Sequence, residues 1–203
     1  LAHTKFATTP SGVTLKTSPG QAAKAAPEAA SHWTPERRAA AIPRDILKGD
    51  DGKWYLRGPD DTLVPYGEEY PSVPTSHRVV LSEPLTWTAG GTVESTTGRL
   101  YFEMPQNKKL NRWIEYVCSA SVVTDTATGR SLILTAAHCV YDDVNKSFAQ
   151  DVWFVPRLLD TTGSSDAFGC DQALGCWSAD YGVVDSRWTT TRWPNNIAWD
   201  YEI

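Results

Sequence analysis

The stretch Leu134-Thr135-Ala136-Ala137-His138-Cys139-Val140 joins an apolar segment to a histidine and a cysteine, and the fold expected for residues 97–203 is worked out from it. Residues 131–135 are apolar enough to predict a short strand, which ends just before two small alanines. A second cysteine lies upstream, in Cys118-Ser119-Ala120-Ser121-Val122-Val123. His138 is therefore the first residue whose role needs an explanation.

Taken together, these two stretches resemble the first catalytic segment of the chymotrypsin/trypsin-like serine proteases. In that family the histidine of a Thr-Ala-Ala-His-Cys run is the general base, and its neighbouring cysteine is disulfide-bonded to the cysteine of a Cys-Ser-Gly-Ser-type strand. The resemblance implies that His138 is a general base and that Cys139 pairs with Cys118. Residues 98–102 and 148–156 are also similar to secreted bacterial peptidases of the glutamyl endopeptidase-like branch. The resemblance covers residues 97–203 and leaves residues 1–90 outside.

A catalytic imidazole needs a buried carboxylate on its second ring nitrogen, because the carboxylate fixes the tautomer and stabilises the imidazolium that forms. The chymotrypsin triad is the worked case of this principle, and its chain order is histidine, aspartate, serine. The family places its aspartate just before an apolar strand, and Asp200-Tyr201-Glu202-Ile203 is similar to that motif. The resemblance thus implies that Asp200 orients His138. Asp180 and Asp185 are the poorer candidates for the same role.

No Gly-Asp-Ser-Gly-Gly nucleophile motif occurs in this sequence. Ser119 and Ser121 match the structural cysteine strand of the family, while Ser164, Ser165 and Ser178 stand in polar or loop contexts. We therefore expect the nucleophilic serine in a missing downstream part, and an N-terminal fragment that is catalytically incomplete by itself. The three other histidines, His3, His32 and His77, lack any catalytic context and are expected to be solvated.

The four cysteines predict two disulfides in an oxidising compartment, and hence a secreted protein. Cys118 and Cys139 lie on neighbouring strand-like segments, while Cys170 and Cys176 bracket a short loop. Unpaired buried cysteines are the alternative. A zinc site is not expected, because no Cys-x2-Cys or His-x3-His spacing occurs.

Short strands separated by turn signals predict an all-β fold with an antiparallel barrel or sandwich. In residues 113–123 alternate positions are apolar, as in a half-buried strand. The resemblance specifies a six-stranded chymotrypsin-like barrel at residues 91–203, truncated, with the second barrel missing. Residues 1–20 are rich in Thr, Ser and Pro, whereas Thr34-Pro35-Glu36-Arg37 predicts a helix start, with a cap residue followed by proline. We expect residues 1–90 to be a poorly structured pro-region or linker, with a small accessory domain as the alternative.

Net charge and hydropathy argue against two classes of binding partner, nucleic acids and membranes. The formal net charge of −5 and the lack of a basic run argue against nucleic acid. No apolar run reaches the ~18–20 residues that span a bilayer. The resemblance implies a secreted serine endopeptidase, made as a zymogen, that acts on proteins or peptides through a His-Asp-Ser triad and an acyl-enzyme, without a cofactor. The alternatives are a non-catalytic protease homologue that binds proteins, and, less favoured, a thiol enzyme using Cys139 with His138.

Overall fold

The computed structural model describes residues 6–8, 14–17, 31–68, 89–124, 131–156 and 175–201. The described chain is mostly β and forms several sheets whose pairings are antiparallel with one exception. The expected all-β class therefore agrees with the structure. No set of described strands closes into a barrel, so the barrel is not part of the observed architecture.

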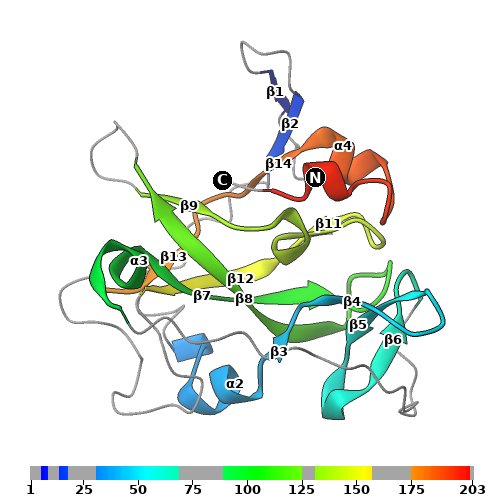
Figure 1. The fold of residues 1–203 in the computed structure, drawn as a ribbon, viewed down its shortest axis with the longest axis horizontal. Coiled ribbons are helices and arrows are strands. Elements are labelled where there is room, and N and C mark those ends of the chain that lie inside the picture. Colours follow the sequence, from blue (N-terminus) through cyan, green and yellow to red (C-terminus); the bar gives the residue numbers. More distant parts are fainter. Residues whose placement is uncertain are drawn as a thin grey trace.

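The largest sheet has the order β13-β12-β7-β8-β3, with β9 also paired to β8 (Figure 1). Its strands are β3 (Ile42–Pro43), β7 (Thr97–Pro105), β8 (Trp113–Val123), β9 (Leu132–Leu134), β12 (Gln150–Pro156) and β13 (Trp177–Ser178). Strands β7 and β8 form a long hairpin that pairs Thr97 with Ser121 at one end and Pro105 with Trp113 at the other. The β8–β3 pairing is the parallel one.

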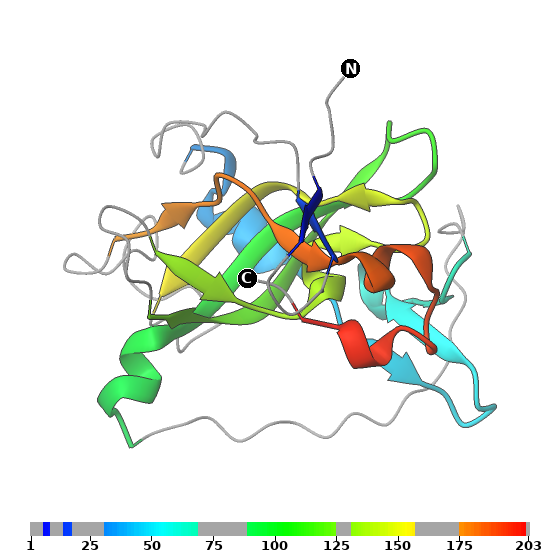
Figure 2. The same ribbon diagram turned by 90° about the horizontal axis from the view of Figure 1, so that it is seen from above.

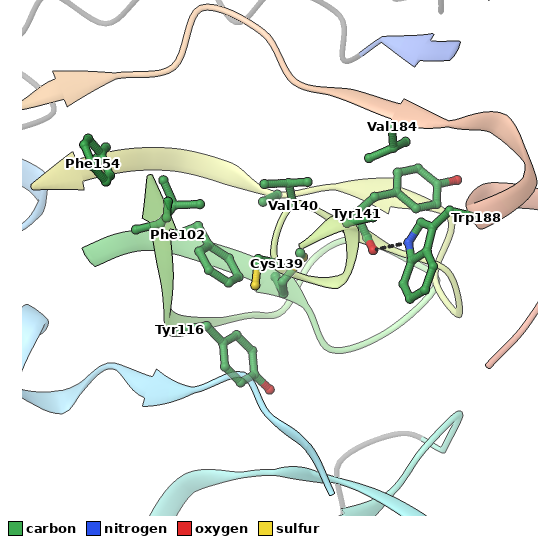
Figure 3. Close-up of a cluster of buried hydrophobic side chains, with 13 residues drawn as sticks. Phe102, Tyr116, Cys139, Val140, Tyr141, Phe154, Val184 and Trp188 are labelled. Carbon is green, nitrogen blue, oxygen red and sulfur yellow. Dashed lines mark hydrogen bonds between the residues drawn. The ribbon is translucent and has the colours of Figure 1, made fainter. Parts of the chain in front are cut away.

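Apolar clusters pack against both faces of this sheet, because successive side chains along a strand point to opposite faces. The even-numbered positions of β8 pack into the larger apolar cluster, as the sequence predicted; they are Ile114, Tyr116, Cys118, Ala120 and Val122. Figure 3 shows part of that cluster, with the Trp188 indole donating to the Tyr141 carbonyl at 3.1 Å. On the opposite face Val117 and Tyr101 pack with Trp33 and Trp153.

Residues 31–68 are ordered secondary structure, which corrects the expectation of a poorly structured N-terminal region for this part of the chain. They form α2 (Pro35–Ala40), β3, β4 (Ile46–Lys48), β5 (Trp54–Arg57), η1 (Pro59–Asp61) and β6 (Leu63–Pro65). The Pro and Gly residues that suggested disorder instead lie at the ends of short helices and strands and in the turns between them. Pro35 occupies the first turn of α2 after the cap Thr34, and Gly52 takes φ 76° in the β4–β5 turn.

This N-terminal part packs against the large sheet and does not stand apart from it (Figures 1 and 2). The Trp33 side chain is 1% exposed, and its indole N–H donates to the carbonyl of Asp151 at 2.6 Å. Arg37 bridges Glu103 and Glu115, one on each strand of the β7–β8 hairpin. Core and ionic contacts thus join residues 31–68 to the strands that follow residue 90.

Most of the remaining elements lie around the turn that carries His138, which we call the histidine turn. They are η2 (Ala137–Cys139), β10 (Tyr141–Asp142), β11 (Ser147–Phe148), β14 (Val183–Asp185), α4 (Ser186–Thr190) and η3 (Ile197–Trp199). Farther away lie α3 (Gly91–Thr96) and the pair β1 (Phe6–Thr8) and β2 (Thr14–Thr17), of which β2 pairs with β14. None of the helices in the described ranges is long and apolar enough to cross a membrane.

Candidate functional site

His138 lies in the short 3-10 turn η2, which is separated from the end of strand β9 by Thr135 and Ala136. The turn closes through Cys139 N–H, which donates to the carbonyl of Ala136 at 3.0 Å. At the entrance to the turn, the hydroxyl of Thr135 donates to the carbonyl of Ser119 on β8 at 2.9 Å. The histidine is thus presented by a turn that is fixed to the large sheet.

Asp200 binds His138 at two points. Its Oδ2 lies 2.7 Å from the ring Nδ1, and its Oδ1 accepts the main-chain N–H of the same histidine at 2.8 Å. Both side chains are largely buried, with exposed fractions of 20% for His138 and 15% for Asp200. Of the three predicted carboxylates, the structure brings only Asp200 to the histidine.

This geometry fixes the tautomer of the ring. A carboxylate oxygen only accepts hydrogen bonds, so the proton of a neutral His138 lies on Nδ1 and points at Asp200. The lone pair of Nε2 is then available to accept a proton. No residue in the described ranges hydrogen-bonds Nε2. A base of this kind, oriented by a carboxylate, is what general-base chemistry requires.

Cys118 and Cys139 form a disulfide that joins β8 to the histidine turn. The two sulfurs and a ring nitrogen of His138 all lie within 4.8 Å of one another, so the bond is adjacent to the imidazole. The disulfide leaves Cys139 without a free thiol, which removes the basis for a thiol enzyme. Cys176 is also disulfide-bonded, while Cys170 lies outside the described residues.

Asp185 supports the segment around Asp200. Its buried carboxylate accepts from the guanidinium and main-chain N–H of Arg187, and from the hydroxyl of Tyr201 at 2.9 Å. Arg187 in turn lies over the ring of Trp199, 5.0 Å from its centroid. Hydrogen bonds from Arg187 hold the pKa of Asp185 below its ordinary value. Both neighbours of Asp200 are thus tied to one ion pair.

A buried arginine that the sequence did not single out holds the other side of the histidine turn. Arg44 Nε donates to the carbonyl of His138 at 2.8 Å, and its Nη2 donates to Asp142 Oδ2 at 2.9 Å. The side chain of Arg44 is 3% exposed. The contact joins residues 94 positions apart, and no local pattern signals it.

Asp143 is a second buried carboxylate next to this turn, at 1% exposure. It accepts from the hydroxyl of Tyr66, from the main-chain N–H of Trp193 at 3.2 Å and from the side-chain amide of Asn196 at 3.0 Å. Burial, and then the charge of Asp143, raise the pKa of Tyr66 far above its ordinary value. The phenol therefore stays protonated and donates.

His32 is not a solvated residue, so that prediction was wrong. Its ring Nε2 lies 3.1 Å from Glu103 Oε1, and its Nδ1 lies 3.1 Å from Nη1 of Arg37. Since the guanidinium only donates, Nδ1 accepts and Nε2 carries the proton. The difference arises because two side chains bind the ring, Glu103 from β7 and Arg37 from α2. His3 and His77 lie outside the described residues.

Two side-chain groups in the described ranges have the proximity that metal binding needs. The first is Cys118, His138 and Cys139, whose sulfurs are oxidised to a disulfide and are not thiolate ligands. The second is His32, Glu103 and Asp151. There the guanidinium of Arg37, 2.8 Å from Glu103, already supplies the positive charge, and His32 has its proton on the nitrogen that would face the ion. Neither group suits a metal.

The predicted catalytic set stays without a nucleophile among the described residues. Ser119 and Ser121 lie on β8, and Ser178 lies on β13. No hydroxyl among them hydrogen-bonds His138. Ser164 and Ser165 lie outside the described residues.

Comparisons with known proteins give no match to any protein-family model, any curated protein or any solved structure.

Proposed function

We propose that this chain supplies the general base and its orienting carboxylate to a secreted serine endopeptidase of the chymotrypsin/trypsin-like type. One observation carries the proposal: Asp200 holds both the ring Nδ1 and the main-chain N–H of His138. An ordinary ion pair between a carboxylate and a histidine involves the ring alone and leaves the backbone of the histidine free. A two-point contact fixes where Nε2 points, and orientation is what a catalytic histidine needs.

In the proposed reaction His138 Nε2 removes the proton of a serine hydroxyl as that oxygen attacks a peptide carbonyl. Asp200 stabilises the imidazolium that forms. His138 then returns the proton to the leaving amine, and water releases the acyl group by the same steps. The serine and the donors for the oxyanion belong to a part of the protein outside these residues.

Two further features support the proposal. The sheet around β7, β8, β9 and β12 holds the histidine turn at its edge, and we propose that it corresponds to the first six-stranded barrel of that protease type. The disulfide between Cys118 and Cys139 suits an oxidising compartment, which supports secretion.

Labelling of the full-length protein with a fluorophosphonate tests the function. We expect one serine to be labelled, and we expect His138→Ala to slow labelling by several orders of magnitude, because members of a triad act as a unit. His32→Ala is the matched control, since His32 also contacts a carboxylate but lies elsewhere. An unlabelled wild-type protein, or labelling unchanged by His138→Ala, would contradict the proposal. The first of these results would favour the non-catalytic, protein-binding homologue.

A further inference from the structure

We propose that Arg44 is a positioning residue for His138, and that residues 31–68 are consequently a permanent part of the site instead of a removable pro-region. The catalytic consequence rests on the proposed function. The structural part does not, because it concerns only how the histidine turn is held.

Arg44 acts as a clamp on the turn that carries His138: its side chain binds the turn, and its backbone is fixed to the large sheet. Its guanidinium makes two charge-assisted contacts, at 2.8 Å to the His138 carbonyl and at 2.9 Å to Asp142 Oδ2. It also lies over the ring of Tyr116, 4.9 Å from the centroid. Its main-chain N–H donates to the carbonyl of Val117 at 3.1 Å, directly after strand β3. Backbone and side chain of Arg44 are both fixed to the large sheet.

These contacts complete the restraint on His138. The main-chain N–H of His138 is held by Asp200, and its main-chain carbonyl is held by Arg44. A rotation of the backbone at this residue would therefore break one of the two bonds. Because the ring follows its backbone, the clamp helps to set the direction of Nε2.

Asp142 connects Arg44 to the turn that follows strand β10. Its Oδ1 accepts the main-chain N–H groups of Val144 and Asn145, at 2.9 and 2.7 Å. The carboxylate is 6% exposed, so its charge needs a partner inside the protein, and Arg44 supplies it. Loss of the arginine would leave both Asp142 and the His138 carbonyl short of a donor.

An arginine is required here for its shape as well as its charge. The guanidinium presents Nε and Nη2 in a fixed fork, which matches two acceptors at once. The ammonium of lysine is a point charge on a flexible stem and cannot reproduce that spacing. Arg44→Lys therefore separates positioning from simple charge balance.

The same contact has a consequence for activation. Arg44 belongs to the region that was expected to be a pro-region, and Tyr66 from the same region donates to the buried Asp143. A cut between residues 68 and 89 would leave the earlier residues bound through these interior contacts. If they were released, the histidine turn would lose its clamp.

The first test compares Arg44→Lys and Arg44→Met with Arg37→Lys in the full-length protein. Arg37 is the matched control, because it also joins the N-terminal part to the sheet through ion pairs but does not touch the histidine turn. The readout is the NMR signal of the Nδ1 proton of His138. We expect that signal to broaden or disappear in both Arg44 variants and to persist in Arg37→Lys. A persistent signal in both Arg44 variants, or equal loss in all three, would overturn the proposal.

In the full-length enzyme we expect the Arg44 variants to lower kcat by about ten- to a hundredfold, the scale of a small misplacement of a catalytic group. KM should stay within about twofold, since the side chain of Arg44 is 3% exposed and offers a substrate almost no surface. An unchanged kcat would overturn the catalytic role. If the wild-type enzyme were never labelled but the Nδ1 proton still depended on Arg44, only the proposed function would fail.

A second measurement uses the wild-type chain and therefore does not depend on whether the Arg44 variants fold. A protease recognition site inserted between residues 68 and 89 of the wild-type chain is cut, and the products are separated by size exclusion under native conditions. We expect both fragments to elute together with the His138 signal intact. Release of the N-terminal fragment with that signal unchanged would overturn the proposal.

Discussion

Asp200 accepts hydrogen bonds from the same residue with both of its oxygens: Oδ2 from the ring Nδ1 of His138 and Oδ1 from its main-chain N–H. An asparagine cannot copy this arrangement, because it has one accepting and one donating group. The main-chain N–H cannot change its role, so it should keep the oxygen of the amide. The amide NH2 would then face Nδ1.

Asp200→Asn should therefore move the proton of His138 from Nδ1 to Nε2, which is the wrong tautomer for a general base. Nitrogen chemical shifts of the imidazole distinguish the two tautomers and check this directly. The proposed function adds a second expectation: in the full-length protein the same change should lower kcat by a factor on the order of 10⁴, as the corresponding change does in the chymotrypsin triad. Asp180→Asn is the control, because Asp180 is exposed and lies outside the contact. An Nδ1–H tautomer that survives Asp200→Asn would contradict the interpretation.

Short-range patterns explain what could be predicted from the sequence. The alternation in β8 placed Tyr116 and Ala120 on one buried face, and both are in the core. The Thr34-Pro35 cap pattern predicted α2. The contact between His138 and Asp200 joins residues 62 positions apart, and it was expected only because a family resemblance named both residues.

Long-range contacts explain what was missed. Arg44 reaches His138 across 94 positions, Tyr66 reaches Asp143 across 77, and His32 reaches Glu103 across 71. Arg44 and Tyr66 lie in segments with frequent Pro, Gly and Asp, and His32 follows an Ala-rich stretch, so no apolar period marks a buried face around any of them. Burial of an arginine, a tyrosine hydroxyl or a histidine is decided by the partner that the fold brings to it, and a local pattern does not contain that partner.

The disulfide between Cys118 and Cys139 should stabilise the fold as well as the histidine turn. Its sequence separation is 21, and closing a loop of that size in the unfolded chain is worth about 3 kcal/mol in the chain-entropy model. Cys118→Ala combined with Cys139→Ala should lower the free energy of unfolding by about that amount. Urea denaturation measures the change. Substitution is preferable to reduction, because Cys176 is in a disulfide as well and would react too. An unaltered unfolding free energy would show that the bond adds nothing to stability.

Tyr66→Phe should destabilise the protein by about 1–3 kcal/mol, because it removes a donor from the buried carboxylate of Asp143. Tyr101→Phe is the matched control. Tyr101 is also buried, at 5% exposure, but its hydroxyl makes no hydrogen bond to a residue in the described ranges. That variant should change the unfolding free energy by less than about 0.5 kcal/mol. Thermal and urea unfolding of the two variants give the comparison. Equal losses would mean that the ring, and not the hydroxyl, carries the effect.

The ionisation of Asp185 should make the unfolding free energy of the protein depend on pH. Hydrogen bonds from Arg187 hold the pKa of Asp185 in the folded state below its ordinary value, so the folded protein favours the ionised form. The resulting stability is fully present above the unfolded pKa and is lost as the pH falls through the folded pKa. Asp185→Asn removes this contribution, which we expect to be about 2 kcal/mol at neutral pH for a hydrogen-bonded charge.

The difference in unfolding free energy between wild type and Asp185→Asn should therefore be constant at neutral pH and shrink below about pH 3.8. Urea denaturation at a series of pH values measures it. Asp180→Asn, at an exposed position, should show no such difference. Because Asp185 also accepts from Tyr201, the neighbour of Asp200, the NMR signal of the His138 Nδ1 proton should broaden in Asp185→Asn. A destabilisation that stays the same at all pH values would assign the role of Asp185 to packing instead of charge.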